Sequence, residues 1–89
     1  MIKKPITINL STGLEARPVA QLVQVASQFN SEIYVEIGKK RVNAKSIMGL
    51  LSLEIKQGES IFVLANGKDE KQAINGLSTL VANNFAEED

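Results

Sequence analysis

Apolar positions recur with two different periods along the 89 residues of the chain. Alternation with a period of two, or a short unbroken apolar run, marks three segments, which are residues 6–10, 33–37 and 61–65. Spacings of three and four residues mark three others, which are residues 18–29, 47–55 and 73–85. The first pattern is typical of strands and the second of amphipathic helices. With a return strand at residues 40–44, the predicted order is βαββαβα.

The predicted strands carry signals of their place in a sheet. Pro5 begins the segment that alternates through Leu10, and because proline cannot donate a ladder hydrogen bond, we expect this strand at an edge. Gly38-Lys39 is a two-residue turn between residues 33–37 and 40–44, which predicts a hairpin. Interleaved strands and helices with one hairpin favour an α+β fold. We expect an open-faced β-sandwich, a four-stranded antiparallel sheet covered on one face by three helices.

The first and third predicted helices have recognisable starts. Pro18 fits a first helical turn, because the N–H group that it lacks would be unpaired there, and this helix should end near Phe29. Asp69 is followed three residues later by Gln72, which predicts a capping box for the third helix. The acidic residues 87–89 should fray, because negative charge is unfavourable at the C-terminal end of a helix.

The second helix is short and begins with a residue that suits two roles. Ser46 directly before an apolar helical pattern is a preferred N-cap, and its hydroxyl is also a candidate phosphorylation site. Gly49 weakens the helix by roughly 1 kcal/mol relative to alanine. We assign Ile47 to the core and Met48 to a surface that contacts a partner, because methionine adapts well to a docking surface.

Composition narrows the classes of function. The ten basic and ten acidic residues cancel, so neither direct nucleic acid binding nor membrane binding is expected. The chain has no cysteine and no histidine, and so lacks thiolate chemistry and the commonest metal ligand and general base. We therefore expect no metal, no cofactor and no enzymatic activity. One cluster is basic, more often a solvated face than a binding site, although it could help hold a phosphate: Lys39, Lys40, Arg41 and Lys45.

The chain is short, and its N-terminus has no targeting signal. With 89 residues and 44% hydrophobic content, residues 1–89 should form a single domain with one core. The first five residues lack the apolar run of a secretory signal. We therefore expect a cytoplasmic protein.

Two motifs resemble a known family. The segment Gly13-Leu14-Glu15-Ala16-Arg17-Pro18 resembles the active-site loop of HPr, the phosphocarrier of the bacterial sugar phosphotransferase system. In that family a histidine at the position of Glu15 carries the phosphoryl group, cradled by the helix N-terminus and by the arginine that corresponds to Arg17. The segment Lys45-Ser46-Ile47-Met48-Gly49 resembles the regulatory-serine segment of HPr proteins from Gram-positive bacteria. A chain with the serine but without the histidine most resembles Crh, the catabolite-repression group of this family.

The resemblance covers nearly the whole chain and implies both a fold and a function. The expected fold is the HPr-like sheet with strand order 1-4-2-3. The expected protein is phosphorylated on Ser46 by HPr kinase/phosphorylase and then binds a catabolite-control repressor as a co-repressor. The docking surface carried over from the family comprises Arg17, Ala20, Gln21, Gln24, Ser46, Met48 and Leu51. The edge strand could also exchange between two copies and give a strand-swapped homodimer, because a glycine-bearing loop joins it to the rest.

Glu15 stands where the family has its histidine, and three interpretations remain open. Its carboxylate can simply complement the positive end of the helix dipole, which is the interpretation we favour. It can imitate a phosphorylated histidine and hold Arg17, although one charge is a poor copy of nearly two. It can also accept a phosphoryl group itself, which would make the protein a carrier between enzyme I and sugar permeases.

Overall fold

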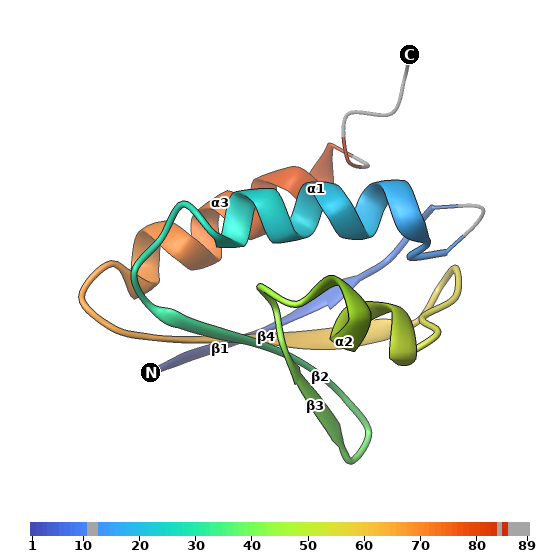
Figure 1. Cartoon of the computed structure of the whole chain (residues 1–89), viewed down its shortest axis with the longest axis horizontal. Helices are drawn as coiled ribbons and strands as arrows, with labels where there is room; N and C mark the ends of the chain where they lie inside the picture. Colours follow the sequence, from blue (N-terminus) through green and yellow to red (C-terminus); the bar gives the residue numbers. More distant parts are fainter. Residues whose placement is uncertain (11–12, 84, 86–89) are drawn as a thin grey trace.

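The structure is a computed structural model that describes residues 1–10, 13–83 and 85. Its elements, in chain order, are β1 (Ile2–Thr7), α1 (Ala16–Ala26), β2 (Glu32–Ile37), β3 (Lys40–Asn43), α2 (Ile47–Ser52), β4 (Ser60–Asn66) and α3 (Glu70–Ala82). The four strands form one antiparallel sheet in the order β1-β4-β2-β3. Figure 1 shows α1 and α3 side by side over one face of this sheet, with α2 beside the β2–β3 hairpin. The predicted element order, strand order and fold class are confirmed.

The first strand begins earlier than its alternating pattern predicted. β1 spans Ile2–Thr7, and Pro5 pairs with Phe62 at the sheet edge, as expected. Ile8 lies beyond the strand but is fully buried, and its N–H donates to the Glu59 carbonyl at 3.0 Å. Alternating burial therefore continues past the end of the ladder. Side-chain alternation marks extended backbone, whereas the strand itself is limited to the residues that have partners in β4.

The core lies between the helices and the inner face of the sheet. On β4, Ile61, Val63 and Ala65 face the core and are buried, whereas Phe62 on the other face is 40% exposed. Leu64 also lies on that other face but is only 2% exposed, so the alternation in exposure ends there. The helices contribute one apolar stripe each, as their spacing predicted: Val19, Leu22 and Ala26 from α1, and Ala73, Ile74, Leu77 and Val81 from α3. Phe85, also predicted to belong to this stripe, is 1% exposed. Each fully buried valine, leucine or isoleucine side chain contributes about 1.5 to 3 kcal/mol, so these stripes hold the helices against the sheet.

The open face of the sheet carries a small network of charges and rings. The Glu36 carboxylate lies 3.3 Å from Lys3 Nζ and 3.2 Å from Arg41 Nη2, which joins β1, β2 and β3 across the sheet. Lys3 Nζ also lies 4.5 Å from the centre of the Phe62 ring. The hydrogen bonds from Arg41 and then from Lys3 lower the pKa of Glu36. The network therefore links side chains of β1, β2 and β3 on the open face of the sheet, outside the hydrophobic core.

The helix ends differ from the sequence prediction. α2 ends at Ser52 and α3 at Ala82, each about three residues before the end of its predicted apolar pattern. α1 ends at Ala26, before the predicted Phe29. Beyond Ala26 the backbone forms a tight turn with a hydrogen bond between residues three apart, from the Phe29 N–H to the Ala26 carbonyl at 3.2 Å. The capping box of Asp69 and Gln72 is wrong, since the Asp69 side chain makes no cap hydrogen bond. At the start of α3 the side chain of Glu70 makes a hydrogen bond to the preceding loop instead: its Oε1 accepts from the Gly67 N–H at 3.1 Å. The predicted fraying of residues 87–89 lies outside the described residues.

The Asp69 carboxylate instead clamps the end of the α1–β2 connection. It accepts hydrogen bonds from the Asn30 N–H at 2.9 Å, from the Ser31 N–H at 3.0 Å and from the Ser31 hydroxyl. Ser31 is 1% exposed, and a Cβ on Gly67 would lie 2.6 Å from its Oγ, so glycine is needed for the two loops to approach. The bond from the Ser31 hydroxyl, followed by that from Asn30, lowers the pKa of Asp69 from its ordinary value of 3.8. The clamp joins two loops that are far apart in the sequence.

Asp69→Asn should reduce the stability of the protein at neutral pH and weaken its dependence on acid. A depressed pKa in the folded state means that the folded protein binds fewer protons than the unfolded chain. The stabilisation by Asp69 is therefore complete above the ordinary pKa and is lost as the pH falls through the lower folded value. Urea midpoints measured from about pH 7 down to about pH 2 should fall more steeply for the natural protein than for Asp69→Asn.

Glu32→Gln is the matched control for this loss of one negative charge. Glu32 is exposed on the open face of the sheet, and in the described part of the chain it has no hydrogen bond or ion pair from its side chain. Its variant should keep the natural acid dependence. An acid slope in Asp69→Asn equal to that of the natural protein would show that the clamp contributes nothing to stability.

Candidate functional site

Ser46 is the N-cap of α2, as its sequence context predicted. Its backbone is extended, with φ −115° and ψ 113°, and its Oγ accepts a hydrogen bond from the Gly49 N–H at 3.1 Å. The Ser46 carbonyl accepts from the Leu50 N–H at 3.1 Å, which is the first α-helical hydrogen bond of α2. The Ser46 side chain is only partly buried. The hydroxyl therefore lies at the surface, at the positive end of a short helix.

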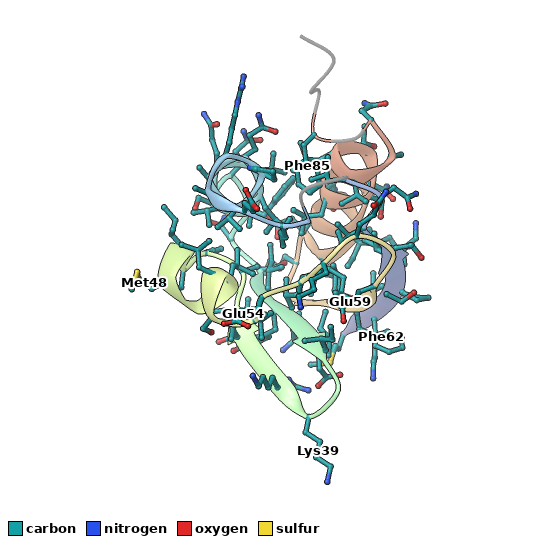
Figure 2. The ribbon with its side chains drawn as sticks, turned by 90° about the vertical axis from the view of Figure 1, so that its right-hand side faces the viewer. Lys39, Met48, Glu54, Glu59, Phe62 and Phe85 are labelled. Atoms are coloured by element: carbon teal, nitrogen blue, oxygen red, sulfur yellow. The ribbon has the colours of Figure 1, made fainter. Side chains whose placement is uncertain are left out.

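The exposed side of α2 is apolar. Met48 is 78% exposed, Ile47 is 46% exposed and Leu51 is 36% exposed, while Leu50 faces the core at 1%. Met48 projects away from the body of the molecule in Figure 2. The assignment of Ile47 to the core is wrong, because Leu50 anchors the helix and a helix of six residues turns Ile47 outward. Ser46 thus lies at one end of an apolar surface formed by Ile47, Met48 and Leu51, which we call the α2 surface.

Glu15 and Arg17 occupy the start of α1 but face different surroundings. Glu15 is the N-cap residue of α1, is exposed and makes no side-chain cap hydrogen bond. Arg17 is also exposed and lines a cavity of about 60 Å³ together with Pro18, Gln21 and Phe85. The two charges therefore belong to different sides of the first helical turn.

The other predicted docking residues divide between two faces of α1. Ala16, Ala20 and Gln24 are four residues apart, so they form one row along the helix, and all three are exposed. Ala16 contacts the same hollow as Leu51 of the α2 surface. Gln21 is partly buried, and its Oε1 is fully buried with no hydrogen-bond partner among the described residues. Ala20 and Gln24 therefore continue the exposed row that begins at Ala16 beside the hollow, whereas Gln21 lines a separate cavity with Arg17.

The predicted basic cluster is dispersed in the structure. Lys39 projects from the tip of the β2–β3 hairpin in Figure 2, and Arg41 is paired with Glu36 on the open face. Lys45 Nζ donates to the Phe29 carbonyl at 2.8 Å, so its charge holds the end of α1. Lys39, Arg41 and Lys45 therefore form no common anion site. Among residues 1–10, 13–83 and 85, no helix has the length and hydropathy needed to cross a membrane.

A hollow of about 400 Å³ lies between the start of α1 and the end of α2. The Leu14 N–H donates to the Ile55 carbonyl at 2.9 Å, which ties the two walls together. Gly13 makes this approach feasible, because it has φ +74° and a Cβ there would lie 2.6 Å from the Ile55 oxygen. The lining residues are Leu14, Glu15, Ala16, Leu51, Glu54 and Ile55, together with Lys56. The hollow is continuous with the α2 surface through Leu51.

Glu54 is the residue of this site that sequence reasoning missed. It follows the end of α2 and has φ +52°, a left-handed conformation that favours glycine. Its carboxylate also lies beyond the C-terminal end of a helix, where negative charge is unfavourable. A glutamate gives no sequence signal for a left-handed backbone, so only the structure identifies it.

The comparisons with known proteins agree with this architecture. The family described as the PTS HPr component phosphorylation site matches residues 2–83. The chain therefore belongs to the HPr family. It is 47% identical, over 91% of its length and 96% of the relative's, to the HPr-like protein Crh of Halalkalibacterium halodurans.

Solved structures show the same relationship. The crystal structure of HPr-C-His from Thermoanaerobacter tengcongensis superposes with a TM-score of 0.95 at 49% identity and covers 99% of both chains. A structure of Bacillus subtilis Crh, described as a swapped dimer, superposes with a TM-score of 0.72 at 42% identity, covering 100% of this chain and 98% of that one. The resemblance read from the sequence is confirmed at the level of the family and of its Crh-like members.

Glu54→Gly should stabilise the protein by about 0.5 to 1 kcal/mol. A left-handed residue with a Cβ costs about 1 to 2 kcal/mol, and the greater freedom of glycine in the unfolded chain cancels part of that gain. The free energy of unfolding, measured with urea, is the relevant quantity.

Glu54→Ala is the matched control. It removes the carboxylate but keeps the Cβ, and therefore retains the cost of the left-handed backbone. If Glu54→Ala were as stable as Glu54→Gly, the cost would come from the charge and not from the backbone conformation.

Proposed function

We propose that this protein is a cytoplasmic regulatory phosphoprotein of carbon catabolite repression and is not itself an enzyme. HPr kinase/phosphorylase transfers a phosphoryl group to Ser46, and the modified protein binds a catabolite-control repressor as a co-repressor. The observation that carries the proposal is the position of the Ser46 hydroxyl, at the N-cap of α2 and at one end of an exposed apolar surface.

The chemistry of the chain supports regulation over conventional phosphotransfer. No histidine is present in the 89 residues, so no phosphohistidine can form. The sequence similarity to the Crh protein of Halalkalibacterium halodurans supports the same reading. Ser46 is the remaining family phosphorylation position, and it is accessible at the surface.

A phosphate on Ser46 would change a surface and leave the fold in place. It puts nearly two negative charges at the positive end of α2, an interaction that favours the helix by up to roughly 1 to 2 kcal/mol. Lys45 contributes little to holding this phosphate, because the Nζ of Lys45 already donates a hydrogen bond to the Phe29 carbonyl. The phosphate then lies beside Met48. A partner binds the phosphate through charge-assisted hydrogen bonds, and the same partner covers the apolar α2 surface.

One observation favours a second candidate function. The Glu15 carboxylate is exposed and makes no cap hydrogen bond, so its oxygens are accessible to a phosphoryl donor. The protein would then be a phosphotransferase-system carrier that forms a glutamyl phosphate on Glu15. Such an acyl phosphate requires a donor enzyme adapted to a carboxylate nucleophile.

Repressor affinity should depend both on the Ser46 phosphate and on Met48. The phosphorylated protein should bind most tightly, and Ser46→Ala should bind like the unmodified protein while losing about 1 kcal/mol of stability with its cap. Met48→Ala should weaken binding of the phosphorylated protein by roughly tenfold, since most of an exposed methionine side chain becomes buried. Repressor affinity and circular dichroism should be measured on each form.

Two controls make this test specific. Phe62→Leu alters an exposed apolar side chain on the opposite face of the sheet and should leave repressor affinity unchanged. Treatment with enzyme I and phosphoenolpyruvate, followed by location of any phosphate, tests the Glu15 carrier. Equal affinity of the unmodified and phosphorylated proteins would refute the co-repressor mechanism, and a hydroxylamine-sensitive phosphate on Glu15 would support the carrier.

β1 should exchange between two copies at high protein concentration. It pairs only with β4 in the described sheet, and a connection containing Gly13 leads from it to α1. Gly13→Ala should increase the dimer fraction, because its Cβ would lie 2.6 Å from the Ile55 carbonyl oxygen and disfavour the closed loop. Sedimentation velocity at several concentrations measures the dimer fraction.

Gly38→Ala is the matched control for this backbone change. Gly38 also has a positive φ, of 59°, but a Cβ there meets no atom within 4 Å, so the variant has the same backbone cost without a collision. It should dimerise like the natural protein. A strictly monomeric Gly13→Ala after prolonged storage at high concentration would rule out strand exchange.

A further inference from the structure

The hollow between α1 and α2 combines an apolar floor with two carboxylates. Leu14 and Ile55 are buried beneath it at 4% and 3% exposure, and Leu51 is half-exposed at its border with the α2 surface. Glu15 and Glu54 enter the lining from opposite walls, and both are exposed. This arrangement suits a ligand that is apolar along its length and positively charged at its end.

Neither carboxylate is neutralised by its neighbours. In the part of the chain that the structure describes, Glu15 and Glu54 take part in no ion pair. Lys56 also lines the hollow, and its N–H donates to Glu59 Oε1 at 2.7 Å, so the nearby Glu59 is engaged with the backbone of the turn. Figure 2 shows Glu54 between α2 and Glu59. The hollow therefore carries two negative charges against one positive charge.

We propose that this hollow binds an arginine side chain of the protein that docks on the α2 surface. The aliphatic part of the arginine packs on Leu14, Leu51 and Ile55, and the guanidinium group donates to Glu15 and Glu54. Arginine suits this site better than lysine, because its planar group has five donors and is more weakly hydrated. The proposal rests on the proposed function only in placing a protein partner on the α2 surface.

A metal ion is a poorer match for the same carboxylates. The described residues contain no group of three or more acidic, histidine or cysteine side chains that could hold a metal. Calcium takes six to eight oxygen ligands, so two carboxylates on opposite walls leave most of its coordination unfilled. The volume of about 400 Å³ and the apolar floor instead match a long side chain with an apolar stem.

The position of the hollow predicts the spacing of basic groups on the partner. α2 has six residues and is therefore about 9 Å long, with Ser46 before its first residue and Glu54 beyond its last. A partner helix that lies along α2 would present basic residues about seven positions apart, a rise of roughly 10.5 Å. The residues between them would be apolar and would cover Met48 and Leu51.

The test uses N-acetyl-arginine amide and its neutral isostere N-acetyl-citrulline amide as probes of the unphosphorylated protein. In a titration followed by amide chemical shifts, the arginine probe should shift residues 14–16 and 51–56, and the citrulline probe should bind more weakly. Glu15→Gln and Glu54→Gln should each lower arginine affinity about two- to fivefold, the range of an exposed ion pair. The double variant should bind the two probes equally.

Glu32→Gln controls for the loss of one negative charge and should leave the affinity for the arginine probe unchanged. Glu54→Gly separates binding from folding, because it should lower arginine affinity as Glu54→Gln does while stabilising the protein. Equal affinity for arginine and citrulline in the natural protein, or stronger shifts at the same residues with Mg²⁺, would overturn the proposal. Because no phosphate is present, this outcome is independent of whether Ser46 phosphorylation controls repressor binding.

Discussion

The hydrogen bond from the Leu14 N–H to the Ile55 carbonyl fixes the relation between the two segments that define the site. Its length of 2.9 Å requires the backbone at Gly13 to lie almost against the Ile55 oxygen, and a Cβ at 2.6 Å would prevent this approach. One wall of the hollow is therefore the start of α1, and the other is the chain that leaves α2. Glu15 and Leu51 line the same hollow because of this contact, although nothing in the sequence between them favours their proximity.

The opposite end of α1 is fixed by a second polar contact. The Asp69 carboxylate accepts two backbone N–H groups and one hydroxyl from residues 30–31, and Lys45 Nζ donates to the Phe29 carbonyl. Between these ends, Val19, Leu22 and Ala26 bury the apolar stripe of α1 against the sheet. Apolar burial is not directional, so it stabilises the helix without fixing its exact position along the sheet. The polar contacts at both ends help to set that position, and with it the position of the exposed row formed by Ala16, Ala20 and Gln24.

The sequence predicts the order of the elements and the Ser46 cap, but it does not predict contacts between distant loops or which side of a short helix is buried. The element order follows from the two apolar periods, and the Ser46 cap follows from a serine before a short apolar pattern. Ile47 was misassigned because a helix of fewer than two turns has apolar residues on both sides, and periodicity alone does not say which side is buried. The sequence around Asp69 predicts a local cap, because the actual partners at residues 30–31 are brought near only by the fold. Glu54 gave no signal, since its left-handed backbone arises from the path of the chain after α2.

The charges of the proposed interface are separated by about the distance over which salt screens them. α2 is about 9 Å long, and the screening length at physiological ionic strength is about 8 Å. A phosphate on Ser46 therefore interacts weakly with Glu15 and Glu54 at the far end of the helix, and each end acts on a different group of the partner. With a net formal charge of zero, the whole chain exerts little long-range attraction on a partner. Recognition must then depend on where the charges stand relative to Met48 and Leu51, which makes the spacing along α2 the feature that a partner has to match.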